Sequence, residues 1–288
     1  MTATVLDASP YAPWAERGSV VAGAFRWRLG VRPLDLDDWI ELGPDVDGPG
    51  GWLDETSRLL REHPGTVRCV PPDAAVLAAS AEIADEVVAH LARRWPERSR
   101  ALDPDVHPLE AAARLVPEDL VVMVPRGGAL TLAAGVVCAP NRWDLGSKIG
   151  RSMRDVHAPV PHLDDQLGVD VDRFLDRLRP ERSFWRLGWG IIDVADGYAP
   201  IDGTGPPRPA RPALDDLHVR VERETLRRLP RTGAVLFTIR THVTPLARVL
   251  DGDPTSLVAM RAAVAAMDEP VRGYKGLGAA VREALGVA

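Results

Sequence analysis

The chain has 288 residues, of which 45% are hydrophobic and 26% are charged, and its formal net charge at pH 7 is −6. A chain of this length can bury a sizeable core, as one elaborated domain or as two small ones. Lysine and arginine are scattered among aspartate and glutamate, which gives no broad basic surface for a nucleic acid. We therefore expect no nucleic-acid partner.

The two cysteines, Cys69 and Cys138, lie far apart and belong to no CxxC motif. Neither a disulfide framework nor a structural zinc site is indicated, which fits a reducing compartment. The first twenty residues show no basic segment followed by an apolar run. Nowhere do about 18 apolar residues follow one another without a charged residue among them. We expect a cytoplasmic protein without a membrane span.

Residues 1–50 are rich in proline, glycine and tryptophan, and we expect an arm that packs onto a later core. A helix is predicted over 52–62, followed by a short β-rich run at 66–70. Asp73 is then expected to cap the clearest helix of the chain, in which apolar residues recur at helical spacing as far as Trp95 and Pro96. This helix should bury one face.

Beyond residue 107 the pattern predicts strands as well as helices. A helix over 107–120, broken near Pro117, precedes a hairpin whose two strands flank a turn at 126–128. After a connector, further helices and three more strands are expected. The predicted strands are 120–124, 129–139, 183–194, 217–222 and 234–243, and the predicted helices are 171–178, a short one at 223–230, and two in the tail 254–288 separated by GYKGLG.

This order shows no regular βαβ alternation, which excludes a simple Rossmann fold. We predict an α+β fold with a PAS-like, mainly antiparallel sheet of five strands and helices inserted between the second and third. The expected parts are an arm and helical extension over 1–106, a PAS-like core over 107–250, and a helical tail over 251–288. A PAS-like core holds its ligand between the sheet and the inserted helices.

The connector LGSKIGRSMRDVHAPVP, residues 145–161, holds the most informative histidine. Two prolines follow His157 closely and force the backbone to be extended, so its side chain is presented from a stiff segment. A metal ligand or a catalytic base needs such stiffness. An ordinary loop histidine beside a proline turn is an equally good interpretation. A lone histidine can also serve as the one protein ligand of haem iron.

Arginines recur along the predicted strands at 186, 220, 223 and 240, where they could bind the propionates of a haem or another anion. Arginines at alternating strand positions are more often partners of Asp and Glu, and Glu222, Arg223 and Glu224 could form a buried ion network. Lys148 and Lys275 lie beside glycines, but neither fits a P-loop. The motifs GxSxG, HExxH and GxGxxG are absent as well, which excludes several large enzyme classes.

Several segments together resemble a known family: KIG at 148–150, VHAPVP at 156–161, RLGW at 186–189, VERETLRRLPRTGAVLFTIRTHV at 221–243 and YKG at 274–276. They are similar to the haem-dependent oxidative N-demethylase alpha-subunit family. The resemblance implies haem b bound in a PAS-like domain and oxygen-dependent demethylation of a secondary amine. It also implies electrons from flavin and iron–sulfur partner subunits, with a folate-binding component that takes the formaldehyde in some members.

Within that resemblance, His157 is the expected iron ligand, and Arg186, Arg223 and Arg240 are the expected cofactor-binding residues. No catalytic residue is assigned. The family resemblance implies an asparagine at the position of Gly188 in RLGW. The glycine removes that side-chain amide, so the resemblance does not identify the amine substrate. Two alternatives remain: a haem or small-ligand sensor without turnover, and an assembly subunit that has kept only the fold. The chain carries no reductase motif, so turnover would need an external electron donor.

Overall fold

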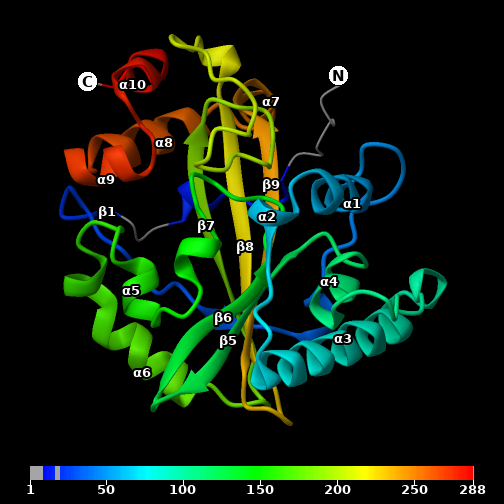
Figure 1. Cartoon of the computed structure of the whole chain (residues 1–288). Helices are drawn as coiled ribbons and strands as arrows, with labels where there is room; N and C mark the ends of the chain where they lie inside the picture. Colours follow the sequence, from blue (N-terminus) through cyan, green and yellow to red (C-terminus); the bar gives the residue numbers. More distant parts are fainter. Residues whose placement is uncertain (1–8, 17–19, 288) are drawn as a thin grey trace.

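The computed structural model describes residues 9–16 and 20–287, and a large antiparallel sheet runs through its centre (Figure 1). Within the described residues this sheet has seven strands in the order β3-β7-β8-β9-β5-β6-β4. A separate hairpin pairs β1 (Val20–Val21) with β2 (Ala24–Phe25). The strands of the large sheet are β3 (Arg32–Pro33), β4 (Arg68–Cys69), β5 (Asp119–Arg126), β6 (Ala129–Val136), β7 (Phe184–Ile192), β8 (His218–Arg228) and β9 (Val235–Pro245).

The predicted α+β class is confirmed, whereas the predicted count of five strands was wrong. The two extra strands, β3 and β4, have two residues each and are too short to show an alternating pattern. The helices are α1 (Trp52–Glu62), α2 (Pro64–Val67), α3 (Ala74–Arg94), α4 (Pro108–Ala113), α5 (Met153–His157), α6 (Val169–Arg177), α7 (Leu246–Gly252), α8 (Ser256–Ala265), α9 (Glu269–Tyr274) and α10 (Ala279–Leu285). The tail after residue 254 thus has three helices where two were predicted.

The predicted short helix at 223–230 was also wrong, because β8 continues as a strand to Arg228. β8 pairs with β7 on one side and with β9 along its whole length on the other. Ladder hydrogen bonds on both sides outweigh the helix propensity of a segment rich in Arg, Glu and Leu. The charged side chains in the second half of β8, from residue 223 to 228, therefore point alternately to the two faces of the sheet.

We define face A as the side of the sheet that carries Leu120 and Arg223, and face B as the side that carries Val121 and Glu224. Apolar residues of α1, α3 and α4 cover the β5–β6 half of face A. On face B, Val156 of α5 packs near Val121, and α6 packs against the β5 and β9 region. Figure 1 shows α3 and α4 on one side of the sheet and α5 and α6 on the other.

The helices α7, α8, α9 and α10 contribute to a second core with β7, β8 and the N-terminal arm. Trp14 of the arm donates from Nε1 to Ser256 Oγ at 2.8 Å, and Phe25 N donates to Ala266 O at 2.9 Å. These bonds tie the arm to the C-terminal helices. Among the described helices, none is both long and apolar enough to cross a membrane.

The long helix α3 begins where the sequence predicts. The Asp73 side chain accepts hydrogen bonds from Ala75 N and Val76 N, which are two of the free N–H groups of the first turn. About two turns further along the helix, the buried Glu82 accepts hydrogen bonds from Arg231 N at 2.7 Å and from Thr232 N at 2.9 Å. The helix therefore also anchors the turn that joins β8 to β9.

Candidate functional site

The connector between β6 and β7 lies over face B and presents His157 at the end of α5. Ser152 caps this short helix by accepting a hydrogen bond from Asp155 N at 3.2 Å. His157 is the last helical residue, and its carbonyl accepts a bond from Val160 N at 2.8 Å. The predicted extended backbone after His157 was therefore wrong, because the prolines lie in a turn. The histidine is still held on a short, capped element.

The imidazole of His157 is half-buried and has a defined orientation. Its Nδ1 lies 2.8 Å from the carbonyl oxygen of Met153, and because a carbonyl can only accept, Nδ1 carries a proton. Burial lowers the pKa of His157, and the positive charges of Arg186 and Lys148 lower it further. Near neutral pH the ring is therefore neutral and Nε2 bears a lone pair. Nε2 has no hydrogen-bond partner within the described part of the chain.

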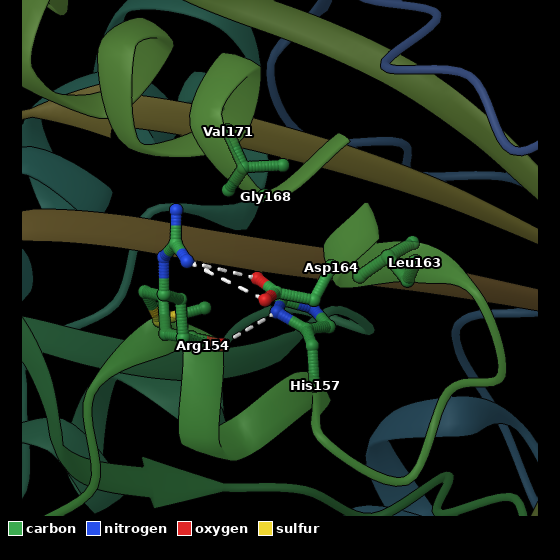
Figure 2. Close-up of a pocket in the computed structure, with 7 residues that line it drawn as sticks. Arg154, His157, Leu163, Asp164, Gly168 and Val171 are labelled. Atoms are coloured by element: carbon green, nitrogen blue, oxygen red, sulfur yellow. Dashed lines mark hydrogen bonds and ion pairs between the residues drawn. The ribbon is translucent and has the colours of Figure 1, made fainter. Parts of the chain in front are cut away.

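A small cavity of about 10 Å³ lies directly against His157 (Figure 2). Met153, Leu163, Gly168 and Val171 supply most of its apolar lining. Figure 2 shows Arg154 reaching toward Asp164 at its edge, where Arg154 Nη1 lies 3.2 Å from Asp164 Oδ1. This volume is about that of one water molecule, so it is not itself a site for an organic ligand.

The open part of face B lies over β7 and β8, next to this connector. Arg186 of β7 forms an ion pair with Glu224 of β8, with 3.0 Å between Nε and Oε2. Gly188 and Gly190 follow on the same face and carry no side chains. A Cβ atom at Gly190 would meet no atom within 4 Å, whereas one at Gly188 would lie 3.1 Å from Glu224 Oε1 and 3.4 Å from Glu222 Oε2. Gly190 thus leaves an open strip on face B, which is bordered by the two carboxylates beside Gly188.

Lys275 borders this strip from the C-terminal segment after α9. Its Nζ donates to the carbonyl of Trp189 at 3.0 Å, at the edge of β7. Burial lowers the pKa of Lys275 to about 8; the carboxylates of Glu222 and Glu224 act to raise it, and Arg186 acts to lower it. Burial also raises the pKa of Glu224, and the like charge of Glu222 raises it further. A lysine and a carboxyl group with shifted pKa values in one place, as Lys275 and Glu224 are, are typical of functional sites.

Trp27 of the arm joins the connector to this C-terminal segment. Its Nε1 donates to Pro161 O at 2.6 Å, and its backbone N donates to Gln166 Oε1 at 2.9 Å. The ammonium group of Lys275 lies 5.4 Å from the centre of the Trp27 ring. The connector, the arm and the C-terminal segment therefore meet around the open strip of face B.

The structure brings only some of the predicted site residues together. His157 and Arg186 lie on face B, close enough that the charge of Arg186 affects the pKa of His157. Arg223 and Arg240 face each other across β8 and β9 on face A, and they are not brought together with His157. Arg223 is paired with Glu41, and Arg240 with Asp45.

The sequence alone did not bring Glu222, Glu224 and Lys275 together. The predicted strand ends at residue 222 and a short helix follows it, so the sequence pattern places Glu222 and Glu224 where a helix begins. Continued strand alternation from 217 onward would have placed both carboxylates on one face. Among the described residues, no group of three or more His, Cys, Asp or Glu side chains is arranged to hold a metal ion. His157 is thus a single candidate ligand.

A family model described as haem-dependent oxidative N-demethylase, alpha subunit-like, matches residues 98–285. The matched range is about two-thirds of the chain and contains the connector, all of β5 to β9 and the C-terminal helices. It therefore includes His157, Arg186, Glu222, Glu224 and Lys275. Trp27, which joins two of these elements, lies outside it.

Proposed function

The chain belongs to the haem-dependent oxidative N-demethylase alpha-subunit-like family, and from this membership we propose that it binds haem b on face B and demethylates a secondary amine. The methyl carbon would leave as formaldehyde. Molecular oxygen would accept four electrons in this reaction, two from the amine and two from an external donor. One of its oxygen atoms would end in formaldehyde and the other in water. The observation that carries the proposal is His157, whose Nε2 is free while Nδ1–H is fixed on Met153 O.

The described residues fit a haem in three respects. A histidine whose Nδ1–H is held by a backbone carbonyl is oriented as metal-binding histidines commonly are, and its lowered pKa keeps it neutral. Gly190 leaves space over β7 for a flat group, since a Cβ atom there would meet nothing within 4 Å. Arg186 and Lys148 supply positive charge near His157, as two propionates require. When bound, the haem supplies the oxygen chemistry.

The carboxylates of Glu222 and Glu224 would bind the amine. A secondary amine is protonated near neutral pH, and its ammonium group is attracted to the two carboxylates that border Gly188. Lys275 Nζ would then accept a proton from this ammonium group, since a pKa of about 8 leaves part of the lysine neutral at working pH. Trp27 and Tyr274 would limit the access of water to the same place.

The family name describes an alpha subunit, which implies further subunits. We propose that a flavin and iron–sulfur partner delivers the electrons and that the fold around face B is PAS-like. A folate-binding partner would accept the formaldehyde.

An absorption spectrum of the chain, purified after expression with sufficient haem, tests the proposal. We expect a Soret band, and formaldehyde on addition of dimethylamine, oxygen and a reductase. His157→Ala should remove or shift the band. His162→Asn is the matched control, because His162 follows the connector directly but is exposed and paired with Asp268. A protein without haem would overturn the proposal, and a Soret band without formaldehyde would favour a non-catalytic haem protein.

A further inference from the structure

Arg220 is a buried arginine on face B to which the proposed reaction assigns no role. It alternates along β8 with Glu222 and Glu224, and it lies opposite Gly190 in the β7–β8 ladder. The residue is only 2% exposed. A buried arginine needs acceptors for its five N–H donors, so the acceptors that it meets show what it holds in place.

The end of the Arg220 guanidinium group is fixed by acceptors from three segments. Nη1 donates to the carbonyl of Gly197 at 3.1 Å, and Nη2 donates to the carbonyl of Ala139 and to Thr241 Oγ1. These bonds join β8 to β9 and to two loops. The remaining side of the group, Nε, donates to Glu222 Oε1 at 2.7 Å. Glu222 is therefore held by a donor that is itself fixed.

A second arginine holds Glu224 in a similar way. Arg186 Nε lies 3.0 Å from Glu224 Oε2. Each carboxylate thus has one oxygen bound by an arginine. The other oxygen, Glu222 Oε2 or Glu224 Oε1, has no hydrogen-bond partner among the described residues, and solvent reaches both of them. Two acceptor atoms on face B are therefore available to a ligand.

The two free oxygens converge on one point above Gly188. A Cβ atom at this residue would lie 3.1 Å from Glu224 Oε1 and 3.4 Å from Glu222 Oε2. These lengths are close to the distance of about 2.7–3.2 Å between the heavy atoms of an N–H···O hydrogen bond. Because residue 188 is a glycine, no side chain occupies this point. A single nitrogen atom of a ligand can therefore donate to both oxygens there.

We propose that Arg220 is a positioning residue of the amine site, because it holds Glu222 Oε1 and thereby directs Oε2 toward the ligand. The inference rests on the function proposed above and concerns how the ammonium group is held before any proton leaves it. A secondary ammonium ion has two N–H donors, one for each free oxygen. A tertiary ammonium ion has one such donor and a quaternary ion has none. The site thus distinguishes amines of equal charge by their number of N–H donors.

Calorimetric titration of the purified 288-residue chain with dimethylammonium chloride and with trimethylammonium chloride tests this inference without turnover. We expect the wild type to bind dimethylammonium at least tenfold more tightly. Arg220→Gln should weaken the binding of dimethylammonium about tenfold and leave that of trimethylammonium unchanged. The reason is that trimethylammonium needs only one oxygen, which Arg186 fixes on Glu224. Equal binding of the two ions by the wild type, or an equal loss of both in the variant, would overturn the inference.

Thr241→Val is the matched control for Arg220→Gln. It removes one hydrogen bond of the same guanidinium group but leaves Nε on Glu222. We expect this variant to keep the tenfold preference for dimethylammonium, even where its melting temperature falls. A loss of the preference in Thr241→Val as large as in Arg220→Gln would show that Arg220 acts only on the stability of the fold.

Glu222→Gln tests the orientation while Arg220 is intact. Nε of Arg220 is a donor, so it binds the amide oxygen and turns the amide NH₂ group toward the ligand. The variant should therefore lose the preference for dimethylammonium. A retained preference would mean that the amide turns freely, which contradicts the positioning role. The Soret band of the same samples reports on haem separately: its absence would contradict the proposed function, whereas the two amine affinities decide the role of Arg220.

Discussion

Gly188 lies so close to Glu224 that a methyl group on the glycine would approach the carboxylate oxygen to 3.1 Å. Contacts of this length are tighter than ordinary van der Waals contact, so a side chain at residue 188 must displace Glu224 or its ion pair with Arg186. The size of residue 188 therefore controls the space between the two carboxylates. An asparagine there would fill the space that the glycine leaves open.

Gly188→Ala should raise the KM for the amine severalfold with a smaller effect on kcat, because it disturbs the proposed amine-binding carboxylates. Steady-state formaldehyde release measures both constants. Gly190→Ala is a matched control on the same strand and the same face, since its Cβ atom would meet nothing within 4 Å. If both variants change KM equally, the effect belongs to the strand and not to the carboxylates.

Lys275 should give the demethylation rate a dependence on pH. Its pKa is lowered to about 8, so the fraction of neutral Nζ rises as the pH rises from 7 to 9. If Nζ accepts the proton of the substrate ammonium, kcat rises across this interval and levels off above it. Lys275→Arg keeps the positive charge, cannot act as a base, and should abolish this rise. A kcat that is independent of pH in the wild type would contradict the role.

The sequence predicted the elements that depend on local pattern. The α3 helix follows from its Asp73 cap and from apolar residues at helical spacing, and five strands of the sheet follow from β-rich runs between turn residues. The second half of β8 was missed because its charged residues are buried by partners distant in sequence. Arg223 meets Glu41, and Arg186 meets Glu224.

The candidate site was only partly predictable for the same reason. His157 was singled out because two prolines follow it closely, and it became the expected iron ligand through the family resemblance. The association of Glu222, Glu224 and Lys275 depends on the register between β7 and β8 and on the packing of the C-terminal segment at the edge of β7. Neither the register nor this packing leaves a local pattern in the sequence.

Arg186 and Arg223 should differ in their effect on haem content. Arg186 lies on face B beside His157, so Arg186→Gln should lower the ratio of Soret absorbance to absorbance at 280 nm in purified protein. Arg223 lies on face A, where it pairs with Glu41. Arg223→Lys keeps the charge and should leave the haem ratio of the folded protein unchanged. A loss in the Arg223 variant alone would mean that the haem lies on face A.

Glu82 should contribute to stability through the turn between β8 and β9. Its buried carboxylate accepts three hydrogen bonds, from Arg231 N, Thr232 N and Thr232 Oγ1. Glu82→Ala should lower the free energy of unfolding by about 2 kcal/mol, as expected when a charged acceptor is removed. Asp85→Ala on the same helix removes only the exposed ion pair with Arg231 and should cost less than about 1 kcal/mol. Urea unfolding measures both.

Glu118 should make stability depend on pH. It is buried, its Oε2 has no partner among the described residues, and burial raises its pKa to about 7. A pKa that is higher in the folded than in the unfolded state means that folding favours the neutral carboxyl group. The contribution of Glu118 to stability is therefore complete below about pH 4.5, the pKa of the unfolded state, and is lost as the pH rises to about 7.

Glu118→Gln cannot ionise and keeps an oxygen for the bond from Glu41 N. The free energy of unfolding of this variant, relative to the wild type at the same pH, should therefore rise between pH 4.5 and 7 by at most about 3 kcal/mol and then stay constant. The comparison at equal pH matters because His90, whose pKa is lowered to about 4 by burial, changes stability in the opposite direction over the same interval. The exposed Glu283→Gln variant is the control and should follow the wild type. A difference for Glu118→Gln that is constant from pH 4.5 to 8 would show that Glu118 does not titrate there.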